Sequence, residues 1–365
     1  MSAPRTVRAV FEQLAAEGLA QPENLDGLAQ TPAPVEETGS PWYLRLFVGL
    51  SAWIAAILFI VFLGMAEIID PEDSGLLLGL AFCALAAGLA WWKPRSDFLG
   101  QLALALSLAG QILFVIGLAS QSSSLARALF GDPWEWELTL TAIGLIILEL
   151  VLLLVYRTRL HRLISALVIY GALLAILFEW DALTWVHGYL FLLAAGFVAL
   201  QVFDLRLLAG GMGELAQPVT YATALFLLGL LLLPLFDEGD LDWRITALLL
   251  GLVLLALGWR VLLSLGWGLR SGAGLFLLAG CVLLCIPALR MPGILAALIV
   301  LLGGFWRGNR LLVGLAAVFL VFYVGAYYYS LEWTLLVKSL ALMGAGVLLL
   351  ALRLVMLRAA PGGAA

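Results

Sequence analysis

The sequence predicts an all-α fold, a polytopic transmembrane helical bundle of about 12 spans with both termini in the cytoplasm. The first observation is composition. Of the 365 residues, 64% are hydrophobic and 12% are charged, whereas soluble domains average roughly 45–50% apolar and about 25% charged residues. The second observation is the uneven distribution of lysine and arginine between the loops. Because so few polar residues cannot cover a surface in water, the composition excludes a soluble fold.

Residues 1–41 are predicted to form a cytoplasmic segment ahead of the membrane. No signal peptide is expected, because the first long apolar run begins only near Leu46. Apolar residues at helical spacing between Val7 and Leu14 predict a short amphipathic helix, and a proline-rich acidic linker follows at 31–41. The segment is too short for its own core, so it either docks on the membrane or a partner, or remains a mobile tail.

Residues 42–358 are predicted to form the transmembrane domain, and 359–365 a C-terminal tail. A span needs roughly 17–25 apolar residues, so charged and turn-forming clusters mark its boundaries. Residues 272–306 fit one span or two, and Arg290 to Gly293 supply a charge and a helix breaker between them. The predicted spans are Leu46–Ala66, Gly75–Trp92, Phe98–Ser120, Leu138–Tyr156, Leu163–Phe178, Ala182–Phe203, Val219–Phe236, Ile245–Leu265, Gly272–Leu289, Ile294–Trp306, Leu311–Tyr329 and Thr334–Leu352.

Lysine and arginine orient this topology. With twelve spans, fifteen of the 19 basic residues fall on the side of the termini and three on the far side, and Lys338 lies within a span. Cytoplasmic loops carry the excess of basic residues, so both termini are predicted to be cytoplasmic. Merging the ninth and tenth spans would reduce the asymmetry to eleven against seven, which favours two spans there.

Charged residues inside a span are costly and are therefore functional candidates. Glu149 lies about 16 Å from the outer end of the fourth span at ~1.5 Å per residue, where desolvation favours its neutral form unless a cation faces it. It either relays protons or couples ions, or makes a structural hydrogen bond. Lys338 lies about 6 Å into the last span. It either snorkels to the surface or places a fixed cation over an outer cavity.

Other polar and aromatic residues lie within or beside the apolar runs. Gln101 and Gln111 are predicted to share one helix face, continued by Gln121, and to bond between helices. His187 is read as a solvated interfacial residue, with a pH sensor as the alternative, and His161 as a residue of a cytoplasmic loop. Tyrosines near the outer end of the eleventh span form either an aromatic belt or a ligand platform. These are Tyr323, Tyr327, Tyr328 and Tyr329.

Several functional classes have no support in the sequence. The net charge of -5 gives no basic face for nucleic acid. The three cysteines lie in apolar runs without further ligands, so neither a metal nor a cofactor is expected. No catalytic motif occurs and the soluble segments are short, so no enzyme and no catalytic residue are predicted. Small residues at four-residue spacing, such as Gly75 and Gly79, predict close helix packing.

Two stretches resemble a known family of bacterial multi-pass membrane proteins built from a domain of unknown function, often encoded beside GDYXXLXY-motif proteins. The first resembles the opening of that family and comprises 41–46, Gly49, 52–56 and 62–64. The second is similar to its closing helix pair and comprises 327–331, 334–339, Gly344 and Arg353. The resemblance implies a bacterial inner-membrane location and no assigned activity. It also draws attention to Lys338 and the tyrosines.

Two functions follow as hypotheses. The first is a component of an inner-membrane assembly, whose partners are the lipid bilayer and a membrane protein encoded nearby. The alternative is a secondary transporter that uses the intramembrane Glu149 and Lys338.

Overall fold

The fold is helical throughout the part of the chain that the structure describes. The computed structural model describes residues 42–65, 74–92, 97–131, 136–156, 158–209, 212–235, 241–264 and 291–330, with single residues in 266–289 and 336–350. The helices are α3 (Trp42–Met65), α4 (Gly75–Trp92), α5 (Asp97–Phe130), α6 (Glu137–Val155), α7 (Arg159–Glu179), α8 (Trp185–Ala209), α9 (Gly213–Leu230), η1 (Leu233–Leu235), α10 (Trp243–Ser264), α12 (Gly293–Trp306) and α13 (Arg310–Ser330).

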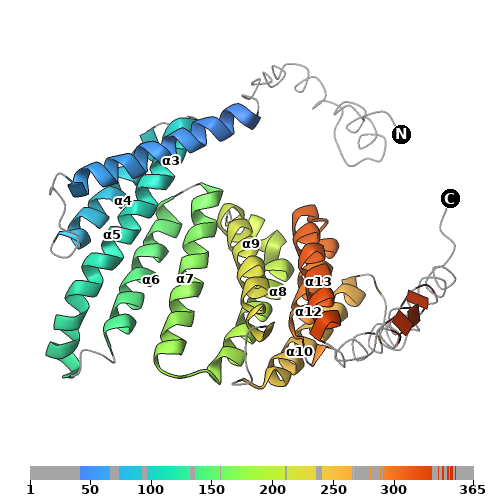
Figure 1. Cartoon of the computed structure of the whole chain (residues 1–365). Coiled ribbons are helices and arrows are strands. Elements are labelled where there is room, and N and C mark those ends of the chain that lie inside the picture. The colour runs from blue at the N-terminus through green and yellow to red at the C-terminus, as the bar shows by residue number, and fades with distance from the viewer. Residues whose placement is uncertain are drawn as a thin grey trace, which may run out of the picture.

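Two groups of helices make up the described bundle. In Figure 1, α3 lies across α4 and α5 at one side, and α6 to α13 stand side by side. Connections α6–α7, α8–α9 and α12–α13 lie at one end, which we call the Tyr156 end (Figure 1). Contacts across these connections, such as Arg162 to Glu214 and Tyr221 to Asn309, tie that end together.

Helices α4 and α5 touch through their backbones. A Cβ atom placed on Gly79 would lie 2.5 Å from the Phe114 nitrogen and 2.6 Å from the Gly110 oxygen. Gly75 and Gly117 form a second close contact between the backbones of the same two helices, where a Cβ atom on Gly75 would lie 3.3 Å from the Gly117 Cα atom. The predicted close packing at Gly75 and Gly79 is therefore confirmed, because only glycine lets two helix backbones approach this closely.

The larger core lies between α8, α9, α10, α12 and α13. Its fully buried residues include Phe197, Leu227, Leu250 and Leu295. Helix α12 has only 14 residues, and most of them are buried. A helix that is apolar on every side is a central one, so the neighbouring helices enclose α12.

The predicted spans agree with the helices in type and differ at several boundaries. Gly75–Trp92 is confirmed residue for residue. The third span continues as helix to Phe130, and the helix of the seventh begins at Gly213, with Pro218 in its second turn. Seven described helices are long and apolar enough to cross a membrane, and Gly293–Trp306 is a shorter apolar helix. The ninth and twelfth predicted spans and residues 1–41 lie outside the continuously described segments.

Candidate functional site

Glu149 is the buried acid of the bundle interior. Its side chain is fully buried, and neither carboxyl oxygen has a hydrogen-bond partner among the described residues. It lies six residues before the end of α6, which places it about 9 Å from the Tyr156 end. The Ser165 hydroxyl of α7 lies beside the carboxyl group, and the Cys83 thiol of α4 lies within range of its charge. The acid therefore faces other helices rather than lipid.

His161 lies one turn from Ser165 and joins α7 to α5. Its Nδ1 atom lies 3.2 Å from the Ser165 hydroxyl, and its Nε2 atom lies 2.9 Å from the Ser107 hydroxyl of α5. The ring of Tyr156 stacks on the imidazole at 3.8 Å between centroids. The imidazole is 1% exposed, so its two ring nitrogens meet serine hydroxyls instead of water.

The direction of hydrogen-bond donation between Ser165, His161 and Ser107 can reverse. A neutral imidazole has one N–H donor and one acceptor nitrogen, so one of the two serines accepts and the other donates. Exchanging the tautomer and turning both hydroxyl groups reverses the direction of donation. Ser165, His161 and Ser107 therefore form a chain that can pass a proton, and rotation of the Glu149 carboxyl group toward the nearby Ser165 hydroxyl would join the acid to it. We call these four residues the Glu149–His161 cluster.

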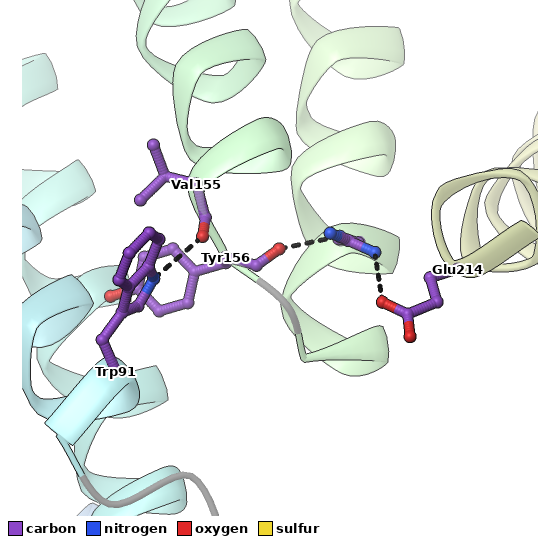
Figure 2. A network of polar contacts seen from close by, with 5 residues as sticks. Trp91, Val155, Tyr156 and Glu214 are labelled. Carbon is purple, nitrogen blue, oxygen red and sulfur yellow. Dashed lines mark hydrogen bonds and ion pairs between the residues drawn. The ribbon is translucent and has the colours of Figure 1, made fainter. Parts of the chain in front are cut away.

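A network of polar contacts closes the Tyr156 end above the cluster (Figure 2). Arg162 donates from Nε to the Tyr156 carbonyl oxygen at 2.7 Å, and its Nη1 atom lies 4.0 Å from Glu214 of α9. Trp91 of α4 donates to the Val155 carbonyl oxygen at 3.1 Å. Burial raises the pKa of the Tyr156 phenol above its ordinary value, so the ring stays uncharged against His161.

The other half of the same helices holds a separate polar pair. Thr141 of α6 donates to the Ser122 hydroxyl of α5 at 3.1 Å. Thr141 lies eight residues before Glu149, which corresponds to about 12 Å along the helix. Between Thr141 and Glu149 the helices are packed by apolar contacts, such as that of the Leu118 side chain with Gly144. The polar chain from the Tyr156 end therefore stops at Glu149.

The predicted glutamine row is only partly correct. Gln101 accepts a hydrogen bond from the Trp53 indole at 3.4 Å, which confirms an interhelix role. Gln111 is buried one turn from Ser107, and its amide nitrogen has no hydrogen-bond partner within the described segments. Gln121 is exposed, so it does not continue the row. The reason is that the residues of one helix meet different neighbours at different depths.

Two histidine predictions were wrong. His161 is not a loop residue, because α7 begins at Arg159 and the imidazole turns inward between α5 and α6. His187 is 4% exposed rather than solvated, and its Nδ1 atom lies 2.6 Å from the Thr246 hydroxyl. Tertiary packing, which the local sequence does not reveal, buries both rings. The spacing of Ser165 four residues after His161 was the available signal for a shared face.

The tyrosines do not act as one cluster. Tyr323 is fully buried and donates to the Leu228 carbonyl oxygen, so it does not belong to an aromatic belt. Tyr329 is 83% exposed, as a belt residue would be, with Tyr327 and Tyr328 half-buried beside it. Lys338 lies outside the described residues.

The sequence comparison identifies the family. The profile of the domain of unknown function DUF4401 matches residues 41–359. The chain belongs to this family. No curated protein and no solved structure matches the chain significantly. Together with the seven apolar helices, membership identifies a membrane protein of the DUF4401 family, as the resemblance at the two ends of this domain predicted.

Proposed function

We propose that this DUF4401 protein is a proton-coupled secondary transporter in which Glu149 carries the proton. The observation that carries the proposal is a fully buried carboxyl group in a candidate membrane span, whose oxygens make no hydrogen bond to any described residue. An ionisable group at such a depth is expensive to bury, and in membrane proteins it commonly marks an ion or proton pathway.

The Glu149–His161 cluster supports this proposal over a purely structural role. A structural acid would be expected to hold its oxygens in well-formed hydrogen bonds between helices, and within the described part of the chain those of Glu149 have none, although the Ser165 hydroxyl lies nearby. Ser165, His161 and Ser107 extend the polar path toward the Tyr156 end, whereas apolar packing fills the other direction. Polar groups on one side of Glu149 and apolar packing on the other would connect the acid to a single side of the membrane, as alternating access requires of each state.

Proton movement in proteoliposomes tests the proposal. Vesicles contain a pH-sensitive dye and a deproteinised bacterial extract as a source of solutes, and a potassium gradient with valinomycin imposes the potential. The wild-type protein should move protons faster than empty vesicles do, and Glu149→Gln should return the rate to that of empty vesicles.

Glu137→Gln is the matched control, because it removes a carboxyl group from the first turn of the same helix. This variant should keep the wild-type rate. A wild-type rate equal to that of empty vesicles, or an unchanged rate in Glu149→Gln, would contradict the proposal.

The location in the membrane is part of the same proposal, whereas assembly is a separate hypothesis. The resemblance to bacterial multi-pass proteins supports the inner membrane, and the basic residues of the loops support an orientation with the Tyr156 end on the cytoplasmic side. Membership of an assembly stays a prediction. The apolar groove of about 840 Å³ between α7, α8 and α9 fits acyl chains as well as a partner helix, so it does not favour assembly. Recovery of no stoichiometric partner from native membranes would count against the assembly hypothesis.

A further inference from the structure

A polar cavity lies at the Tyr156 end, apart from the Glu149–His161 cluster. It measures about 420 Å³ between the last turns of α8, the start of α9 and the α12–α13 connection. This volume is within the range of small-molecule sites. Its lining comprises Gln201, Asp204, Gly213, Gln217, Thr220, Tyr221, Arg307, Gly308, Asn309 and Arg310.

The charge of the cavity favours an anion. Arg307 and Arg310 supply two positive charges to the lining and Asp204 one negative charge. Helices α9 and α13 both begin at this cavity, at Gly213 and Arg310. The N-terminus of a helix carries a partial positive charge, so both helices add to the attraction.

The protein holds these groups in place. Arg307 donates from Nε to the Gln201 carbonyl oxygen at 2.7 Å, and its guanidinium lies 4.5 Å from the centre of the Trp306 ring. Asn309 donates from Nδ2 to the Tyr221 hydroxyl at 2.9 Å. Gln201 lines the cavity and is 5% exposed, and its buried amide nitrogen has no hydrogen-bond partner among the residues that the structure describes. The cavity wall is therefore ordered and holds a donor still to be satisfied.

The combination of two arginines with one carboxylate in the lining indicates the chemical class of the ligand. Arginine binds phosphate oxygens through several N–H groups, whereas the Asp204 carboxylate only accepts hydrogen bonds. An acceptor beside two arginines suits hydroxyl groups on a ligand that is negatively charged as a whole. We propose that this cavity binds a phosphorylated polyol, either as the head group of an anionic phospholipid or as a free molecule such as glycerol phosphate.

Position in the bundle is consistent with either source. The cavity lies at helix ends, where lipid head groups meet a membrane protein. Leu200 and Phe203, each next in sequence to a cavity residue, line the apolar groove between α7, α8 and α9. The polar cavity and the apolar groove therefore lie on neighbouring faces of α8, at the same level along the helix. The inference does not depend on proton transport.

Binding to the purified full-length protein tests this inference with two probes. Native mass spectrometry compares phosphatidylglycerol with phosphatidylcholine, and thermal stabilisation measures free glycerol 1-phosphate. Arg310→Gln removes an exposed charge of the lining, and should weaken binding of the recognised probe about tenfold, the size of one charge-assisted hydrogen bond.

Arg260→Gln is the matched control, because it removes an exposed arginine of α10 outside the lining. Binding of phosphatidylglycerol alone would identify the lipid source, binding of glycerol phosphate alone the free source, and competition between them a shared site. Failure of both probes to bind, or equal weakening by both variants, would overturn the inference.

Discussion

Replacing Gly79 by alanine should separate α4 from α5. The new Cβ atom would lie 2.5 Å from the Phe114 nitrogen and 2.6 Å from the Gly110 oxygen, and ordinary contact begins at 3.4 Å. The helices must therefore open by about 0.9 Å, because both obstacles are backbone atoms that cannot rotate away. Overpacking of this kind costs about 3 kcal/mol at the upper end of its range. Alanine returns about 1 kcal/mol of helix propensity, which leaves a net loss of about 2 kcal/mol.

Gly88 of the same helix is the control, because a Cβ atom there meets nothing within 4 Å. Gly88→Ala should gain the propensity alone, so the free energies of unfolding of the two variants should differ by about 3 kcal/mol. Titration with sodium dodecyl sulfate in mixed micelles, followed by the fluorescence of the 13 tryptophans, measures this difference. Equal stability of the two variants would refute the close crossing.

Two further substitutions have opposite expected signs. Tyr323→Phe removes the hydroxyl that bonds the Leu228 carbonyl oxygen in the last turn of α9. It should cost about 1–2 kcal/mol in the same titration, whereas Tyr329→Phe, at an exposed ring, should cost nothing measurable. Glu149→Leu removes an acid without partners at similar volume and should stabilise the fold by about 1–2 kcal/mol while abolishing proton movement. A destabilised Glu149→Leu protein would indicate a structural role for the acid.

The sequence predicted helix boundaries correctly where a helix ends together with its apolar run. Gly75–Trp92 was predicted residue for residue because charged or turn-forming residues flank both sides of a continuous apolar run. Where the helix continues through polar residues, the prediction ended too early. Helix α5 runs on through a serine-rich stretch to Phe130, where the serine hydroxyls bond carbonyl oxygens of the preceding turn and so need no partner outside the helix. Hydropathy marks the membrane and not the end of a helix.

The candidate site was only half predictable. Glu149 was evident, because an acid in an apolar run is rare whatever surrounds it. His161 was missed because it lies between Arg159 and Arg162, in a stretch that reads as a charged loop. Its burial depends on Ser107, 54 residues earlier, and on the Tyr156 ring. Contacts between distant parts of the chain decide such a residue, and no local pattern records them.

Infrared spectroscopy of the protonated carboxyl group tests the central claim most directly. If Glu149 carries a proton that reaches water through His161, the wild-type protein should show a buried carboxylic acid band that Glu149→Gln lacks. That band should shift within minutes of transfer into D₂O, because the proton exchanges along the Glu149–His161 cluster. Absence of the band, or a band unshifted after hours in D₂O, would contradict a proton pathway through Glu149.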